Sequence, residues 1–177
     1  MLHMPSPDVS FESAGNGDAE AISIMSRQIW QAHYRPHILT EGELEFFWQR
    51  AYRPDSIRSD MRNGSRYEWI RVEARPVGFM AYRAESEACR LHLGKLYLDP
   101  EFHGLGIGAM ALARVLELAV AEGLREIYLY VFRQNLKAIR AYVKAGFVIA
   151  RTEMTECGKG YRYDDFVMVR RVLPEAC

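Results

Sequence analysis

The sequence has no excess of charge of either sign, since 23 basic and 23 acidic side chains balance among its 177 residues. Proteins that bind nucleic acid or an anionic membrane surface usually carry a basic excess, so neither is expected as a partner. Apolar runs are also short, and none approaches the roughly 18 residues of a membrane-spanning helix. Residues 1–5 lack the basic and apolar regions of a signal peptide. We therefore expect a cytoplasmic protein.

Cysteine is scarce as well, and the count is odd: Cys89, Cys157 and Cys177. No Cys-x-x-Cys pair occurs among them. His33 and His37 have the spacing of a helical metal pair, but Pro36 interrupts the helix, so no metal is expected. The simplest interpretation is a reduced chain in which Cys89 is an inert thiol buried in a strand.

The hydrophobic fraction of 49% and the charged fraction of 26% are those of an ordinary globular domain with a sizeable core. We expect residues 1–8 to form a loose N-terminus and residues 9–173 to form a single domain. Periodicity and turn signals predict strands at 9–12, 67–72, 77–82, 89–98, 126–132, 147–152 and 161–171. Helices are predicted between Asp18 and Pro36, at 41–51, 55–62 and 109–121, and from Asn135. Arg75 and Pro76 are expected to form a hairpin turn, and the whole order predicts a mixed α/β sheet with helices on both faces.

The most informative segment is the loop His103-Gly104-Leu105-Gly106-Ile107-Gly108, between the apolar run 91–98 and the amphipathic run 109–121. Alternate glycines let the backbone approach a ligand closely, and the start of a helix adds unpaired N–H groups. Such a loop binds phosphates. Lys-Ser/Thr does not follow the last glycine, which excludes a Walker loop, and the glycine spacing differs from the dinucleotide fingerprint. A purely structural glycine turn is the alternative.

A second motif follows about 27 residues later and starts at Asn135, which fits a helix N-cap. At 100° per residue, Asn135, Ala138 and Tyr142 share one stripe of this helix, whereas the adjacent stripe is apolar and predicts core. Gly146 has the position of a helix terminator. The helix therefore presents a polar cap, a small residue and a phenol along one line.

Together the two segments resemble the GCN5-related N-acetyltransferase (GNAT) superfamily. Its acetyl-CoA loop has the pattern Gln/Arg-x-x-Gly-x-Gly/Ala, matched by His103, Gly106 and Gly108 with His in the first place. Its later Asn-x-x-Ala/Ser-x-x-x-Tyr and Gly-Phe pattern is matched by residues Asn135, Ala138, Tyr142, Gly146 and Phe147. The resemblance is strong over about residues 91–150. The chain looks most like small single-domain bacterial acetyltransferases of the diamine, ribosomal-protein-alanine or PaiA type.

The resemblance implies an α/β (α+β) fold with a mixed, mostly antiparallel central sheet, helices on both faces and a splayed wedge that takes acetyl-CoA as cosubstrate. It also implies the residues that bind acetyl-CoA: Leu96, Tyr97, Leu98, His103, Gly104, Leu105, Gly106, Ile107, Gly108, Ala109, Asn135, Ala138 and Tyr142. Such enzymes transfer the acetyl group directly from thioester to amine. A homodimer is left open.

The same resemblance assigns Tyr142 as the general acid that protonates the departing CoA thiolate. A phenol with a pKa near 10 is protonated at pH 7 and can donate. The alternative is a tyrosine that only packs. Family members often place a base, Glu, on the strand before the glycine loop, and residues 90–98 hold none. Strand alternation puts His92 and Gly94 on one face with Leu96, which makes His92 the candidate base. A structural or surface histidine is the alternative.

The acceptor is expected between the first helices and the last strands, with Trp30, Tyr34, His92 and Tyr163 as its binding residues. Aromatic rings beside the carboxylates of Asp164 and Asp165 suit a cationic amine. Ordinary interface composition is the alternative. The sequence thus predicts acetyl transfer to a primary amine of a small molecule or a peptide N-terminus. A non-catalytic acyl-CoA-binding sensor on the same fold is the rival function.

Overall fold

The computed structural model describes residues 8–34 and 38–172. Residues 1–7 of the expected loose terminus and His37 lie outside this part. Within it, the strands are β1 (Val9–Ala14), β2 (Arg66–Val72), β3 (Arg75–Glu85), β4 (Arg90–Leu98), β5 (Glu126–Phe132), β6 (Val148–Gly158) and β7 (Tyr161–Arg171). The α-helices are α1 (Ala19–His33), α2 (Glu41–Tyr52), α3 (Pro54–Arg62), α4 (Ile107–Ala121) and α5 (Leu136–Lys144). Short 3-10 turns occupy Asn16–Asp18, Ser86–Ala88 and Pro100–Phe102.

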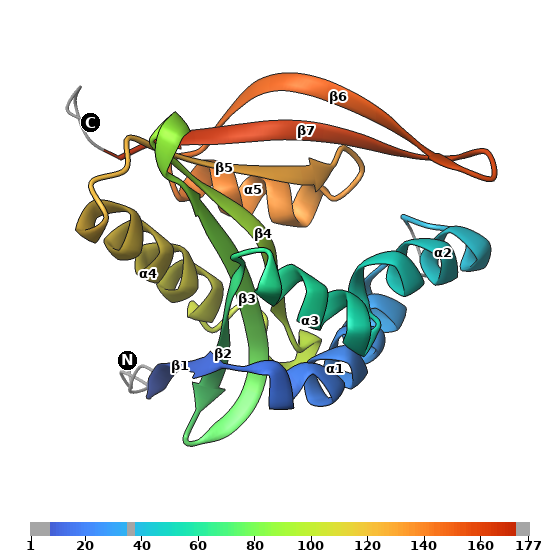
Figure 1. The fold of residues 1–177 in the computed structure, drawn as a ribbon, viewed down its shortest axis with the longest axis horizontal. Helices are drawn as coiled ribbons and strands as arrows, with labels where there is room; N and C mark the ends of the chain where they lie inside the picture. Colours follow the sequence, from blue (N-terminus) through green and yellow to red (C-terminus); the bar gives the residue numbers. More distant parts are fainter. Residues whose placement is uncertain (1–7, 35–37, 173–177) are drawn as a thin grey trace, which may run out of the picture.

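The strands form one sheet in the order β1-β2-β3-β4-β5-β7-β6 (Figure 1). Every neighbouring pair is antiparallel except β4 and β5, which run parallel. This parallel pairing covers only residues 90–92 of β4 and 126–128 of β5, and beyond it the two strands separate. The mixed, mostly antiparallel sheet and its central splay confirm the expected fold class.

Helices cover both faces of the sheet (Figure 1). On one face, α1, α2 and α3 pack on β2 and β3 through a core that includes Ile22, Phe47, Ile57, Trp69 and Phe79. On the other face, α4 packs on β3, β4 and β5 through a core that includes Met80, Leu91, Ile107, Val115 and Leu129. α5 also lies on this second face, where Ile139 and Tyr142 contact the core. Among the described helices, none has the length and apolar character to cross a membrane.

The hairpin turn between β2 and β3 differs from the expectation. Glu73 and Ala74 form it, with φ values of 48° and 67°, whereas Arg75 and Pro76 are already paired in β3. This is the type I′ geometry, which needs left-handed backbone at both central positions, and the fixed negative φ of proline forbids it. Pro76 is accommodated because the register shifts opposite it, at Arg71.

A β-bulge at Gly94 breaks the alternation of β4. Lys95 pairs with Ala81 and Leu93 pairs with Tyr82, so Gly94 is left out of the register. Leu93 and Leu96 therefore lie on one face, against the α4 core, and His92 points to the opposite face. The expectation that His92 and Leu96 share a face is wrong, because a bulge adds one residue and inverts the side-chain parity beyond it.

The cysteines also depart from expectation. Cys157 is a free thiol, but Cys89 is disulfide-bonded. Cys89 is only partly buried and has φ of 50° at the end of the Ser86–Ala88 turn, so β4 begins one residue later, at Arg90. The interpretation of Cys89 as a reduced, buried strand residue is therefore wrong.

Candidate active site

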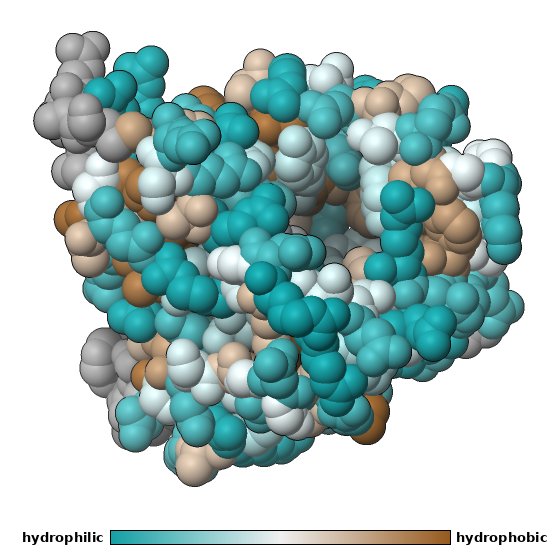
Figure 2. All heavy atoms as spheres, viewed as in Figure 1, coloured by the Kyte–Doolittle hydropathy of each residue, from teal (hydrophilic) through white to brown (hydrophobic). Residues whose placement is uncertain are grey.

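A cavity of about 960 Å³ fills the wedge between the separated ends of β4 and β5. It opens on the face seen in Figure 2, between the β5–β7–β6 part of the sheet and the α1–α3 layer. The ends of α1 and α2, the glycine loop, the first turn of α4, and α5 complete its lining. All the predicted site residues line this cavity except Leu105, which is 54% exposed. The fold thus gathers segments from residue 29 to residue 165 into one site.

The glycine loop forms an open cradle of backbone amides. Gly104 and Gly106 have φ of 83° and 81°, which favours glycine, and a Cβ at either position would meet nothing within 4 Å. Gly106 is the N-cap of α4 without a side-chain hydrogen bond, and the first turn of α4 holds no acidic residue. The amides of this turn are therefore available, together with the positive end of the helix dipole, to an anion such as a pyrophosphate.

Lys137 adds a cation beside this cradle, although it was not among the predicted site residues. Its Nζ lies 2.6 Å from Nδ1 of His103, and Nε2 of His103 lies 3.1 Å from the carbonyl oxygen of Leu98. Lysine can only donate, so Nδ1 accepts and the Nε2–H donates to Leu98. Burial and then the charge of Lys137 lower the pKa of His103, which is consistent with this neutral tautomer. The positive charge at the cradle belongs to Lys137.

The edge of β4 that faces the cavity has lost its neighbouring strand from Leu93 onward. Peptide groups along such an edge can hydrogen-bond an extended ligand as an added strand, which is how a pantetheine chain would fit. The side chains of Leu96 and Leu98 pack against the α4 core, as expected. Tyr97 packs toward α1 and α2, where its hydroxyl lies 2.7 Å from that of Tyr52.

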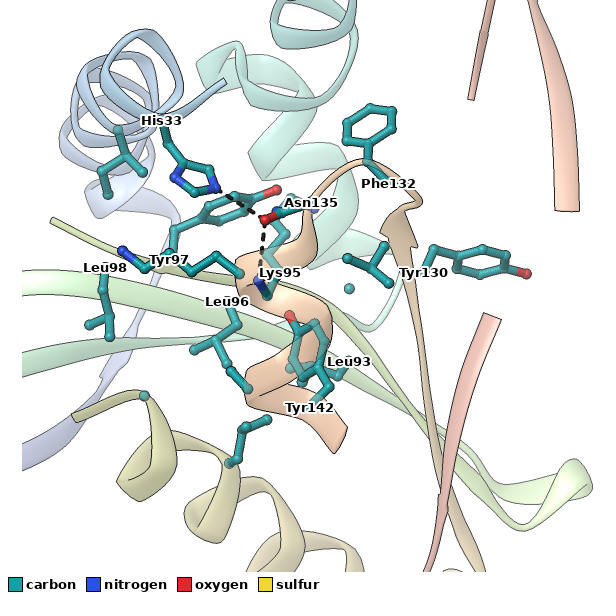
Figure 3. Close-up of a pocket in the computed structure, with 18 of the residues that line it drawn as sticks. His33, Leu93, Lys95, Leu96, Tyr97, Leu98, Tyr130, Phe132, Asn135 and Tyr142 are labelled. Atoms are coloured by element: carbon teal, nitrogen blue, oxygen red, sulfur yellow. Dashed lines mark hydrogen bonds between the residues drawn. The ribbon is translucent and has the colours of Figure 1, made fainter. Parts of the chain in front are cut away.

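Asn135 joins α5 to α1 at the centre of the cavity (Figure 3). Its Oδ1 accepts the N–H of Ala138 at 3.2 Å, which caps α5 as predicted, and lies 3.3 Å from Nε2 of His33. Its Nδ2 donates to the hydroxyl of Tyr34 at 3.5 Å. Tyr142 follows two turns along α5, and burial raises its pKa to about 12. Its phenol is therefore protonated at neutral pH and can donate a proton into the cavity.

Aromatic side chains line the opposite part of the cavity. The Trp30 and Tyr34 rings lie 4.7 Å apart, and Tyr163 stacks on Phe47 at 4.3 Å. Trp30 is 3% exposed, and its Nε1–H has no hydrogen-bond partner in the part of the chain that the structure describes. The residues predicted for the acceptor are thus brought together, and one of them presents an unused donor.

His92 lies in the cavity wall, where its ring stacks on Tyr128 with centroids 4.6 Å apart. Burial lowers its pKa to about 4. An imidazole with that pKa is neutral at pH 7, but it binds a proton only weakly. This environment does not suit the neutral-pH base for which His92 was the candidate.

Two carboxylates line this cavity, of which Asp165 was expected beside a cationic amine and Glu153 was not predicted. Glu153 of β6 and Asp165 of β7 lie opposite one another in the antiparallel register. Burial raises the pKa of Asp165 to about 7. The strand predicted at 147–152 ends before Glu153, whereas β6 continues to Gly158. The only sequence pattern that could place one of these carboxylates in the cavity is the alternation that puts Asp165 on the same strand face as Tyr163.

Comparison with known proteins agrees with this geometry. An uncharacterized N-acetyltransferase of Mycobacterium bovis is 36% identical over 104 residues, or 58% of this chain and 65% of the relative. The peptidyl-lysine N-acetyltransferase YjaB of Salmonella typhimurium is 35% identical over 96 residues, or 52% of this chain and 59% of the relative. The chain thus matches less than two thirds of the length of these relatives.

The fold has solved counterparts as well. The PaiA N-acetyltransferase of Thermoplasma acidophilum, in complex with coenzyme A, superposes with a TM-score of 0.75 and 23% identity over 93% of this chain and 99% of that one. The sequence model of the acetyltransferase (GNAT) family matches residues 27–147, which is more than half of the chain and includes both motifs. The protein therefore belongs to the acetyltransferase (GNAT) family.

Proposed function

We propose that the protein transfers an acetyl group from acetyl-CoA to a primary amine of a small molecule or of a peptide. The observation that carries this proposal is the wedge itself, where an unpaired edge of β4 lies between a cradle of amides and the phenol of Tyr142. An acyl-CoA has the matching parts: an anionic end, an extended amide chain and a thioester. Acetyl-CoA would supply the activated acetyl group.

The residues divide the work by position. The first-turn amides of α4 and the Lys137 ammonium bind the phosphates, and the peptide groups of residues 93–98 align the extended chain. Asn135 caps α5 and so fixes the direction of Tyr142. Tyr142, with its raised pKa, keeps a proton for the departing sulfur. For direct attack by an amine, the protein must position the thioester and supply one proton donor for the departing thiolate.

The amine acceptor is supported by the aromatic wall and by the relative that bears the name of a peptidyl-lysine N-acetyltransferase. The test is to incubate the protein with acetyl-CoA and spermidine, Nα-acetyl-lysine amide or an alanine-starting tripeptide. We expect release of CoA thiol and an acetylated product by mass spectrometry for at least one amine. Saturable CoA binding without thiol release above the background with all three would favour the rival acyl-CoA sensor.

A further inference from the structure

The β6–β7 end of the cavity carries a carboxylate that the steps above do not use. Asp165 of β7 lies opposite Phe132 of β5 on one side and opposite Glu153 of β6 on the other. Directly opposed residues in an antiparallel sheet point to the same face, and all three line the cavity. Asp165 therefore faces the cavity between an aromatic ring and a second carboxylate.

The neighbouring charges leave Asp165 without a counter-ion. Arg133 lies 3.1 Å from Asp164, and Arg151 lies 2.7 Å from Glu153, so each arginine is engaged with another carboxylate. The side chain of Asp165 has no hydrogen bond or ion pair with any residue in the described ranges 8–34 and 38–172. Burial, and then the charges of Asp164 and Glu153, raise its pKa to about 7. This carboxylate can accept a cation or a proton from a ligand.

The other titratable groups nearby do not take this role at neutral pH. Burial raises the pKa of Tyr163 to about 12, and the pKa of His92 is lowered to about 4. Arg50 of α2 lies beside the β6–β7 hairpin, where it donates to the carbonyl oxygen of Cys157 in β6 at 3.2 Å. Asp165, unlike Tyr163 and His92, has a pKa near neutrality.

A second observation on the same wall concerns Trp30. Its buried Nε1–H has no partner among the described residues, and buried donors are rarely left unpaired because each costs free energy. The Trp30 ring contacts Tyr34, whose ring lies 5.8 Å from Phe132, the neighbour of Asp165 across the sheet. A donor that lacks an acceptor and an acceptor that lacks a cation thus belong to one aromatic wall.

We propose that Asp165 binds the ammonium group of the acceptor and acts as the general base of the transfer, an inference that rests on the proposed function. One proton passes from the ammonium nitrogen to an Asp165 oxygen and then to solvent. The nitrogen lone pair bonds to the acetyl carbonyl carbon, the C–S bond breaks, and the sulfur takes the phenol proton of Tyr142. The second nitrogen proton replaces the one that Tyr142 gives.

This assignment defines the class of acceptor. At pH 7 an aliphatic amine with a pKa of about 10.4 is unprotonated in only about one molecule in 2,500, so it gains from a carboxylate that binds the ammonium and takes its proton. An arylamine that is uncharged at pH 7 gains neither. We expect aliphatic primary amines as acceptors.

The test is Asp165→Asn, which keeps the shape and removes the base. With spermidine or Nα-acetyl-lysine amide, we expect kcat/KM of the wild type to rise with pH through about 7. In the variant this rise of kcat/KM with pH is lost, and kcat/KM at pH 7 falls about 100-fold. The difference in kcat/KM between variant and wild type narrows above about pH 9, where free amine accumulates. CoA affinity by calorimetry stays within about twofold of wild type. An arylamine that turns over loses no more than about threefold.

Asp164→Asn is the matched control, because it makes the same chemical change one residue away on the Arg133 side. In this variant kcat/KM still rises with pH, but the midpoint of the rise moves to lower pH, since the Asp164 charge raises the pKa of Asp165. If Asp165→Asn keeps both the rise of kcat/KM with pH and its value at pH 7, the inference is overturned and the proposed function stands. If the wild type acetylates none of the amines, both are overturned.

A second measurement does not depend on turnover. Because the folded pKa of Asp165 is raised above its unfolded value of 3.8, the folded state keeps a proton that the unfolded chain releases, and the wild type loses stability progressively from about pH 4 to pH 7. The gain in Tm from Asp165→Asn should grow over the same range. In carbon-13 spectra of the wild type, the Asp165 carboxyl should titrate near pH 7, and spermidine should lower its midpoint. Titration near pH 4 without a response to spermidine contradicts the proposal.

Discussion

The two halves of the cavity are built from different parts of the chain. The CoA half, which we propose binds acetyl-CoA, consists mainly of backbone: two left-handed glycines, the first-turn amides of α4 and the unpaired edge of β4. The acceptor half, which we propose binds the amine, consists of side chains: Trp30 from α1, Tyr34 directly after it and Asp165 from β7. Backbone recognition requires particular residues at fixed short spacings, whereas a side-chain wall can be assembled from any segments that the fold brings together.

The halves also differ in charge. Lys137 and the helix dipole make the CoA half positive, while Glu153 and Asp165 make the acceptor half negative. These local charges suit an anionic cosubstrate and a cationic acceptor. The formal net charge of zero argues against some partners but does not reveal how charge is distributed within the cavity.

Gly108→Asp is expected to have the largest effect of all, a loss of CoA affinity in the CoA half. A Cβ at Gly108 would lie 3.6 Å from Leu98 Cδ1, an ordinary contact, and an acidic residue in the first turn stabilises a helix, so the variant should fold. A carboxylate about 5 Å from a pyrophosphate charge repels it by about 3 kcal/mol at an effective dielectric constant of about 20. We expect calorimetry to show at least about a 200-fold loss of CoA affinity.

Gly108→Asn is its matched control, since it adds the same bulk without the charge. We expect it to lose much less affinity than the aspartate variant. Equal losses would assign the effect to bulk, and unchanged CoA affinity in a folded Gly108→Asp protein would remove the phosphate site from the glycine loop.

Tyr142→Phe tests the point where the halves meet. The substitution keeps the ring that packs beside Phe147 and removes the proton donor. We expect kcat to fall by about 100-fold or more, the range for a lost general acid, with KM for acetyl-CoA within about twofold. Thiol-release kinetics measure both constants. A variant with the wild-type kcat would leave Tyr142 with a packing role alone.

The contrast between the halves explains how far the sequence could be interpreted. The element order, the Asn135 cap and the glycine cradle depend on local rules, and the structure contains all three. The bulge at Gly94 has only a weak local signal, a glycine inside a strand, because whether the strand gains an extra residue depends on its partner strand. The raised pKa of Asp165 was only partly visible, since Asp164 is its neighbour in the sequence whereas the larger cause, burial, and the Glu153 charge across the sheet come from the fold.

A smaller effect is expected from Trp30→Phe, which tests whether this side chain of the acceptor half binds the acceptor. It keeps most of the ring contacts and removes the unpartnered Nε1–H. If an acceptor oxygen bonds this donor, its loss costs about 1 kcal/mol, or about fivefold in KM for the amine, while CoA affinity is unchanged. Trp48→Phe is the control, because its Nε1–H already donates to Ser26 outside the cavity. Equal KM values in both variants would contradict a ligand role for Trp30.

The smallest effect on catalysis is expected from His92→Gln, although His92 lies on β4 where the family often carries its base. With a pKa of about 4, His92 is already neutral across the working range, so the pH dependence of kcat/KM between pH 6 and 9 should not change.

The stability of the protein should change instead. The unfolded histidine, with a pKa of about 6.5, binds a proton more readily than the folded one, so the wild type loses stability as pH falls from 6.5 toward 4, by about 2 kcal/mol at pH 5. Denaturant unfolding at pH 7 and pH 5 should show a smaller loss for His92→Gln than for wild type. If the variant instead loses the limb of kcat/KM near pH 7, the base belongs to β4 and the division between a backbone CoA half and a side-chain acceptor half does not hold.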